Sequence, residues 1–293
     1  MNPDKSPAFV DRRQVRRSFA RAAARYPEHD FLAREIDARM QSRLDYVRLS
    51  PGLIVDVGCS RGASLAGLRQ RYPEAATLGL DLVPEMLRNP EKSIWRRWLP
   101  LPGENLPQFA AGDAVALPVR SGAAGLIWSN LLLHWLDDPI PALTEMYRAL
   151  EVGGLLMFSA LGPDTLKELR ASFGDGHAHS QRFIDMHDLG DMLVGCGFSD
   201  PVMDMEMMTL TYPSFPALVA ELRASGGRCA MNARSRTLTG KSAWQAVTQA
   251  YEAQASEGRL PASFEVIYGH AWKAAPKNTP DGRAIIRFEK KRA

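Results

Sequence analysis

Short apolar segments that alternate with helical stretches constrain the fold of this chain more than any other feature. Residues 53–57 are apolar apart from Asp56, and a glycine-containing turn and a helical stretch follow them. Similar segments occur at 77–80, 125–129 and 155–160. Apolar strands separated by helices are typical of a parallel sheet covered by helices on both faces. The sequence therefore predicts an α/β fold.

The two ends of the chain follow other patterns. Residues 11–47 are expected to be helical, with a break near Tyr26 because Pro27 cannot continue a helix. Strands are expected at 202–210 and 264–272, with a mostly helical excursion between them. We divide the chain into the following predicted parts: an N-terminal helical part (1–48), a core (49–210), a helical insertion (211–260), the last core strand (261–275) and a tail (276–293).

One stretch, residues 88–110, departs from the alternation of strands and helices. It contains Pro90, Pro100, Pro102 and Pro107, a density that favours an irregular loop. Its two tryptophans, Trp95 and Trp98, fit either a surface insertion packed on the core or a flap for docking.

The candidate binding site lies at the predicted carboxyl ends of the strands. The turn from Asp56 to Gly62 follows the first strand, and its glycines allow a close approach of backbone to ligand. Asp81 ends the next strand, where a carboxylate accepts hydrogen bonds from both hydroxyls of a ribose. Residues 112–114, before an expected further strand, complete an ordered series.

Two competing nucleotide sites fit the sequence poorly. A dinucleotide-binding turn requires G-x-G-x-x-G, but Ser60 and Ala63 occupy the second and third glycine positions counted from Gly58. A phosphate-binding loop ending at 239–242 requires an upstream glycine where this chain has Ser235.

Composition narrows the classes of partner and compartment. The net charge of +3 gives no argument for nucleic acid as a partner. No apolar run approaches the roughly 18 residues of a membrane span. Three cysteines without close pairing favour neither a disulfide framework nor a zinc site, so we expect a cytoplasmic protein without a metal.

The ordered motifs resemble those of class I methyltransferases, which use S-adenosylmethionine. The resemblance rests on 56–62, Asp81, 112–113, and the run Trp-Ser-Asn-Leu at 128–131 with His134-Trp135 after it. The segment from Phe19 to Tyr26 resembles the opening helix of the malonyl-acyl-carrier-protein O-methyltransferases of biotin synthesis (BioC). The resemblance covers roughly residues 15–273 and implies a Rossmann-like, mostly parallel seven-stranded sheet.

The resemblance also assigns expected roles within the cofactor site. Asp56 and the backbone of Gly58 and Gly62 would hold the methionine part of S-adenosylmethionine. Ser60 replaces the family's central glycine, which costs about 1 kcal/mol if its φ is positive, although its hydroxyl could bind the cofactor's carboxylate. The expected set of cofactor residues further along the chain is Asp81 at the ribose hydroxyls, Leu82 beside it in the sequence, Asp113 and Ala114 at the adenine edge, and Asn130 near the sulfonium.

A carboxylate acceptor explains why we find no persuasive pair of nucleophile and general base. Such a group is already ionised at neutral pH and attacks a sulfonium methyl directly. The N-terminal part is expected to form a lid with Tyr26 facing the cofactor. Arg16 or Arg17 would bind the acidic carrier or its carboxylate, to which a guanidinium bonds in a bidentate manner. The expected substrate is malonyl-acyl-carrier protein.

The C-terminal third of the chain resembles a second family as well as it resembles the malonyl enzymes. Residues 162–170, 188–190, 212–213 and 268–273 are similar to a respiratory complex I assembly factor associated with arginine hydroxylation. The open alternatives are such a hydroxylase, a methyltransferase acting on a small molecule such as a quinone, and a non-catalytic factor that binds the cofactor. Ser60 keeps the non-catalytic reading open.

Overall fold

A single mixed sheet organises the chain. The computed structural model of the protein describes residues 9–88 and 106–275. Within these residues a seven-stranded sheet has the order β3-β2-β1-β4-β5-β7-β6, and β7 runs antiparallel to both of its neighbours. The strands are β1 (Leu53–Val57), β2 (Ala76–Asp81), β3 (Gln108–Ala111), β4 (Ala124–Ser129), β5 (Leu150–Leu161), β6 (Ser199–Tyr212) and β7 (Leu260–Trp272). The predicted α/β, mostly parallel fold is confirmed.

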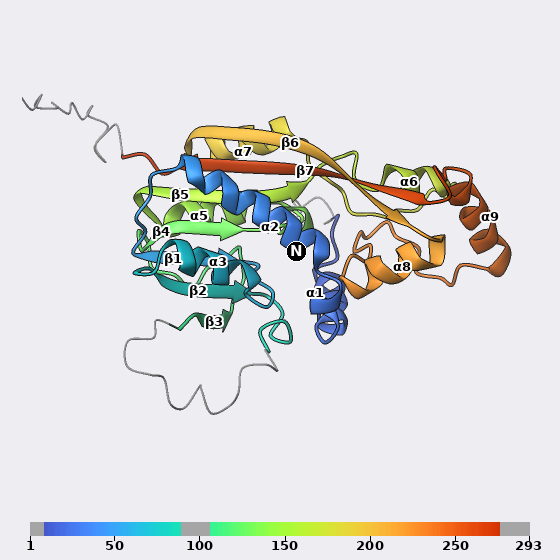
Figure 1. The fold of residues 1–293 in the computed structure, drawn as a ribbon, viewed down its shortest axis with the longest axis horizontal. Helices are drawn as coiled ribbons and strands as arrows, with labels where there is room; N and C mark the ends of the chain where they lie inside the picture. Colours follow the sequence, from blue (N-terminus) through green and yellow to red (C-terminus); the bar gives the residue numbers. More distant parts are fainter. Residues whose placement is uncertain (1–8, 89–105, 276–293) are drawn as a thin grey trace, which may run out of the picture.

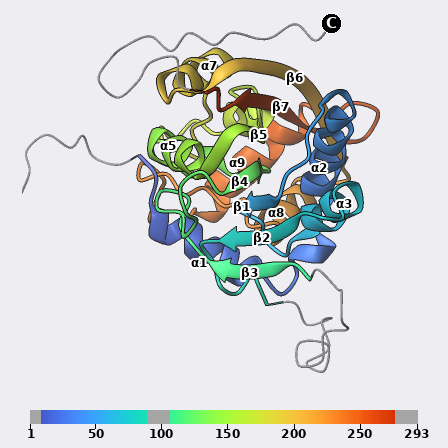
Figure 2. The same cartoon turned by 90° about the vertical axis from the view of Figure 1, so that its left-hand side faces the viewer.

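Helices cover both faces of this sheet (Figures 1 and 2). One face packs against α2 (Phe31–Arg43) and α3 (Ala63–Arg71), and the other against α5 (Ile140–Ala149) and α7 (Met186–Gly195). In β1, Ile54 contributes to the first layer, whereas Val55 and Val57 contribute to the second, as the two-residue repeat of a strand requires. Burying each such side chain stabilises the fold by about 1.5–3 kcal/mol.

The N-terminal helices lie across the open end of the sheet. Helix α1 (Arg12–Ala22) leads through the short helix η1 (Tyr26–Glu28) into α2, so the chain turns at Pro27 as predicted. Helix α2 is tied to the sheet through the buried indole of Trp128, which donates a hydrogen bond to Asp37 at 2.9 Å. Another short helix, η2 (Leu44–Tyr46), follows α2.

The predicted helical insertion is carried by the long strands β6 and β7. It contains α8 (Phe215–Ala224) and α9 (Lys241–Glu252), and α6 (Lys167–Ser172) lies beside α9 (Figure 1). Phe215 and Tyr251 are fully buried there, and the Tyr251 hydroxyl donates to the Pro261 carbonyl at 2.7 Å. Helix α1 packs against α8, so the N-terminal helical part contacts the insertion beside the sheet.

The structure corrects the prediction around residues 88–114. Most of the expected loop, including Trp95 and Trp98, lies outside the described residues, as does the predicted tail at 276–293. Residues 108–110, which we assigned to the loop, begin β3, so a strand that we did not predict ends directly before Gly112. A four-residue strand next to Pro107 carries too little alternation to be recognised from sequence.

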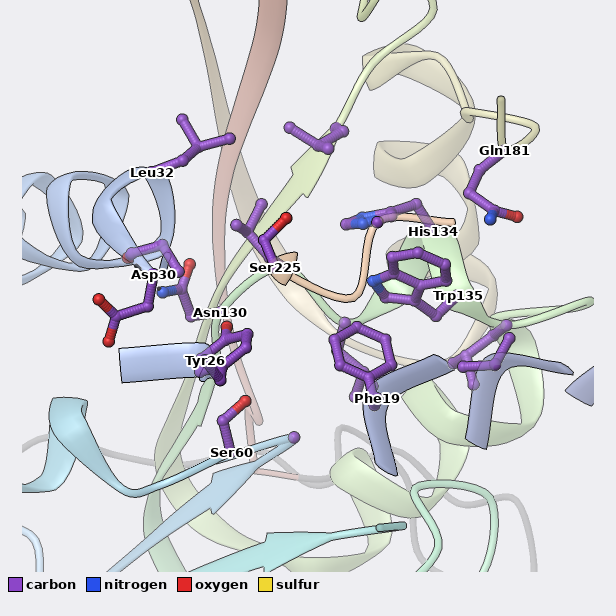
Figure 3. A pocket seen from close by; sticks show the side chains of 18 of the residues that line it. Phe19, Tyr26, Asp30, Leu32, Ser60, Asn130, His134, Trp135, Gln181 and Ser225 are labelled. Carbon is purple, nitrogen blue, oxygen red and sulfur yellow. Dashed lines mark hydrogen bonds between the residues drawn. The ribbon is translucent and has the colours of Figure 1, made fainter. Parts of the chain in front are cut away.

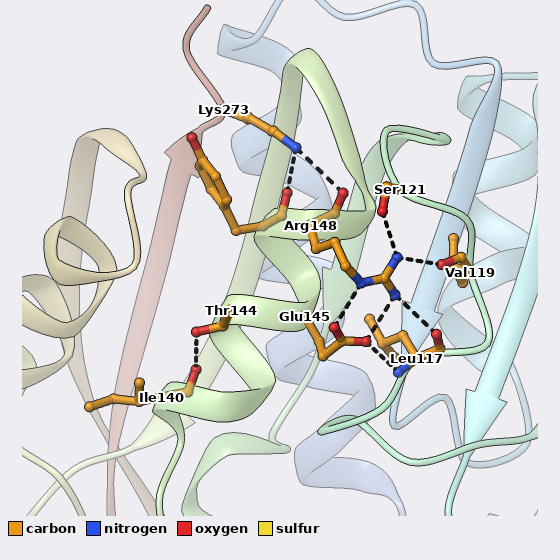
Figure 4. Close-up of polar contacts among 9 residues, drawn as sticks. Leu117, Val119, Ser121, Ile140, Thr144, Glu145, Arg148 and Lys273 are labelled. Carbon is orange, nitrogen blue, oxygen red and sulfur yellow. Dashed lines mark hydrogen bonds and ion pairs between the residues drawn. The ribbon is translucent and has the colours of Figure 1, made fainter. Parts of the chain in front are cut away.

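Arg148 joins α5 to the loop between β3 and β4 (Figure 4). Its guanidinium donates to the carbonyls of Leu117 and Val119 at 3.1 and 2.8 Å and forms an ion pair with Glu145. Glu145 in turn accepts from the Leu117 backbone N–H at 2.9 Å. These bonds satisfy backbone groups in a segment without regular structure.

Replacing Arg148 by Met should lower the free energy of unfolding by about 1–3 kcal/mol, because two carbonyls lose their donor. Urea denaturation measures this change. Arg120→Met, at an exposed position in the same segment, is the matched control. Equal effects of the two substitutions would contradict a specific role for Arg148.

Candidate active site

A cavity of about 860 Å³ opens at the carboxyl ends of β1, β2 and β4. Its wall combines the turn after β1 with residues from α1, η1, β5 and the helical insertion (Figure 3). The predicted residues that line it are Tyr26, Asp56, Gly58, Ser60, Asp81, Leu82, Asp113, Ala114 and Asn130. Segments that are distant in sequence therefore surround one space.

The turn after β1 has the backbone conformation that its glycines suggested. Gly58 and Gly62 have φ of 81° and 76°, and Ser60 adopts 49°. Gly62 does not line the cavity; a Cβ there would lie 2.5 Å from the ring of Phe109, so only glycine fits. Ser60 thus accepts the left-handed strain, about 1 kcal/mol, that the sequence analysis expected.

Asp81 is held by the same turn. Its carboxylate accepts hydrogen bonds from the backbone N–H groups of Ser60 at 2.9 Å and Val83 at 2.8 Å. Burial raises the pKa of Asp81, and these two bonds act in the opposite direction. The carboxylate is therefore oriented at the cavity wall.

Asp56 is the least compensated group in the cavity. It is 1% exposed, and neither carboxylate oxygen has a hydrogen-bond partner among the described residues. Burial raises its pKa well above the ordinary value, and the nearby charges of Asp37 and Asp81 raise it further. A buried carboxylate without donors favours a ligand that brings positive charge or N–H groups.

The lid contributes Tyr26 to this half of the cavity. Burial raises the pKa of Tyr26 to about 12, although a hydrogen bond with Ser60 lowers it. The phenol is therefore neutral at pH 7 and remains a hydrogen-bond donor. Arg61, in the turn, donates to the Ala23 carbonyl at 3.1 Å and so ties the lid to the turn.

The remaining predicted cofactor residues are already bonded within the protein. Asp113 forms an ion pair with Arg12 of α1. The Asn130 amide donates to the Ala33 carbonyl at 2.8 Å and accepts from the Ser159 hydroxyl at 2.7 Å. Asn130 thus joins α2 to the sheet at the cavity wall.

Arg16 and Arg17 lie apart from the cavity. Both are exposed on α1, whose buried side carries Val15 and Ala22. The arginine of α1 that lines the cavity is Arg12. This arrangement does not place Arg16 or Arg17 where they would bind a carboxylate inside the cavity, as we had expected. It leaves them exposed at the surface of α1.

Sequence reasoning missed the aromatic half of the cavity. Phe19 meets Trp135 edge to face, with ring centroids 5.0 Å apart, and His134 lies beside Trp135 (Figure 3). His134 is 4% exposed, its Nδ1 has no partner among the described residues, and burial lowers its pKa to about 3. The imidazole is neutral at pH 7, and with this lowered pKa His134 is a weak base. The one sequence signal for this half is the pair His134-Trp135, which follows the Trp-Ser-Asn-Leu run at 128–131.

The neutral state of His134 predicts a pH-dependent loss of stability. The unfolded chain takes up a proton at this residue below about pH 6.5, whereas the folded chain does so only near pH 3. Stability from this group is therefore lost as the pH falls below 6.5. The free energy of unfolding of the wild type, relative to His134→Gln, should drop by about 2 kcal/mol between pH 7 and pH 5.

Urea denaturation at several pH values measures this difference, with exposed His187→Gln as the control. Parallel pH curves for the wild type and His134→Gln would contradict a buried neutral imidazole.

Comparison with known proteins agrees with this architecture. A family model described as a methyltransferase domain matches residues 55–158. The solved YcgJ protein from Bacillus subtilis has a TM-score of 0.56 at 12% identity and covers 81% of this chain, with 98% of its own length matched. The cyclase SpnF has a TM-score of 0.51 at 17% identity, with 82% of each chain covered. At such identities these structures show the fold alone.

Curated relatives are much more similar. A protein of Nitrosospira multiformis, named malonyl-(acyl-carrier protein) O-methyltransferase, is 45% identical, with 96% of each chain covered. A protein of Laribacter hongkongensis with the same name is also 45% identical, with 96% of each chain covered. The predicted class I fold and the predicted class of enzyme, a methyltransferase using S-adenosylmethionine, are confirmed. The chain belongs to the malonyl-(acyl-carrier protein) O-methyltransferase family.

Proposed function

We propose that this protein methylates the free carboxylate of a malonyl group carried by acyl-carrier protein, as a step in biotin precursor synthesis. The observation that carries the proposal is the division of the cavity into two halves. One half presents Asp56 and Asp81 at the ends of β1 and β2, and the other presents Trp135, Phe19 and the neutral His134. The names of the family relatives support the malonyl substrate.

The carboxylate half suits S-adenosylmethionine. The unpaired oxygens of Asp56 fit the cofactor's ammonium group, together with the turn at Gly58 and Ser60 that lines the cavity. Asp81 accepts hydrogen bonds from neighbouring N–H groups and keeps acceptor capacity for ribose hydroxyls. Leu82 lines the same cavity, as do Asp113 and Ala114, where we assign the adenine. Asn130 lies beside Asp30 and Tyr26 in Figure 3.

The aromatic half suits an acceptor that needs placement but no base. S-adenosylmethionine supplies an electrophilic methyl group bound to a positively charged sulfur. An ionised carboxylate brought next to that methyl needs no proton removed. Phe19 and Trp135 keep water out, and apolar walls favour a transition state in which opposite charges neutralise. Neutral His134 offers a ring N–H for orienting the acceptor.

The lid also carries the charge expected to attract an acidic carrier. Arg13, Arg16 and Arg17 are exposed on α1, and none of them forms an ion pair with another described residue. Such a surface raises the rate of encounter with a negatively charged partner. Among the described residues no helix is long and apolar enough to cross a membrane. The proposed reaction fits the cytoplasmic location that the sequence analysis expected.

The proposal predicts that malonyl-loaded carrier protein, incubated with the enzyme and S-adenosylmethionine, gains the mass of one methylene group. Ester hydrolysis should reverse this gain, because the new bond is an ester. The same carrier loaded with an acetyl group should stay unchanged, since it offers no free carboxylate. Intact-protein mass spectrometry measures both. Methylation of the acetyl carrier, or a gain that resists hydrolysis, would contradict a carboxylate acceptor.

The substitution Asp81→Asn tests the cofactor half of the cavity separately from the acceptor half. Loss of its charge should weaken S-adenosylmethionine binding roughly 10- to 100-fold, as measured by calorimetry, and slow the reaction. Asp191→Asn, the same substitution at an exposed position, should leave affinity unchanged.

A further inference from the structure

Three arginines converge where the lid meets the helical insertion. Arg21 lies in the last turn of α1, Arg223 in the last turn of α8, and Arg228 in the loop after α8. The helices are in close contact there: the ring of Phe19 lies 2.7 Å from the position that a Cβ on Gly226 would occupy. Arg21 and Arg223 are near enough that their charges, after burial itself, lower the pKa of the Arg228 guanidinium.

This cluster has no counter-charge within the described part of the chain. None of its three guanidinium groups forms an ion pair there, and the Nε of Arg228 is buried without a hydrogen-bond acceptor. The nearest acid on α8, Glu221, is bonded to His29 at 2.7 Å. Arg21 and Arg223 each lie in the last turn of a helix, where the helix dipole favours a positive charge. The dipoles do not explain why a third, partly buried arginine lies beside them.

The cluster borders the cavity on the side of the insertion. Ser225 and Gly227, which flank the arginines in sequence, line the cavity, and so does Gln181, whose amide donates to the Arg228 carbonyl at 2.9 Å. In Figure 3 Gln181 lies close to His134, and Ser225 lies between His134 and Asn130. A chain that enters the aromatic half from this side passes the three arginines.

We propose that Arg21, Arg223 and Arg228 bind the phosphate group of the phosphopantetheine arm on which an acyl carrier presents its acyl group. This inference rests on the proposed function, because it takes a carrier-bound acyl group as the substrate. A phosphate has several anionic oxygens in an arrangement that guanidinium groups match in a bidentate manner. Its negative charge also offsets the charge of the partly buried Arg228, which forms no ion pair with another described residue.

The test compares binding of 4′-phosphopantetheine and pantetheine, which differ by the phosphate alone and carry no acyl group. Calorimetry with the full chain should give roughly tenfold or tighter binding of the phosphorylated compound. Arg228→Gln should remove this difference while pantetheine binding stays the same. Arg228→Lys should restore only part of it, because a lysine lacks the planar fork. The matched control is Arg236→Gln, at an exposed position.

Two further variants keep the test decisive if Arg228→Gln does not fold. Arg21→Gln and Arg223→Gln change exposed side chains and should each weaken phosphopantetheine binding. Equal affinity of the wild type for the two compounds would overturn the proposal. So would variants that bind the complete carrier more weakly but phosphopantetheine normally, since the cluster would then contact acidic side chains of the carrier. Neither readout needs methyl transfer, so failure of the proposed function would be seen separately.

Discussion

Two carboxylates lie buried where β1 and β2 end, and the protein compensates them unequally. Asp81 receives two backbone N–H groups, whereas Asp56 receives no hydrogen bond from the described residues. Burial raises the pKa of both, and the proximity of the two charges raises that of Asp56 further. Asp56 therefore lacks partners until a ligand brings positive charge and hydrogen-bond donors. The turn after β1, the lid and the insertion surround the space in which such a ligand would lie.

The lid and the insertion close the cavity from opposite ends of the sequence. Tyr26 covers the turn at Ser60, Phe19 packs on Trp135, and His29 bonds Glu221 of α8. Because these contacts join residues from α1 to α8, the aromatic half forms only when both segments are folded on the sheet. An apolar wall beside a carboxylate-lined wall is the arrangement that transfer of a methyl group between opposite charges requires.

Local patterns determined which parts could be predicted from sequence. Strand β1 and its turn follow from one apolar run and two glycines, and the strain at Ser60 follows from its place between them. Strand β3 could not be found, since four residues beside a proline carry no clear period. Arg12, and not Arg16 or Arg17, is the arginine of α1 that lines the cavity, because how α1 sits against the sheet depends on tertiary packing. The neutral state of His134 depends on Trp135 and Phe183 around it, and thus on tertiary packing.

The most direct test concerns the protonation of the buried carboxylates when S-adenosylmethionine binds. The pKa of Asp56, raised well above its ordinary value by burial, favours the protonated form of this group in the free protein, whereas a positively charged ligand favours its carboxylate. Calorimetric titration at pH 6 in two buffers of different ionisation enthalpy measures the protons exchanged. The account predicts net proton release, which decreases as the pH is raised to 7. Identical heats in both buffers, or proton uptake, would contradict the claim that the uncompensated Asp56 at the end of β1 defines the site.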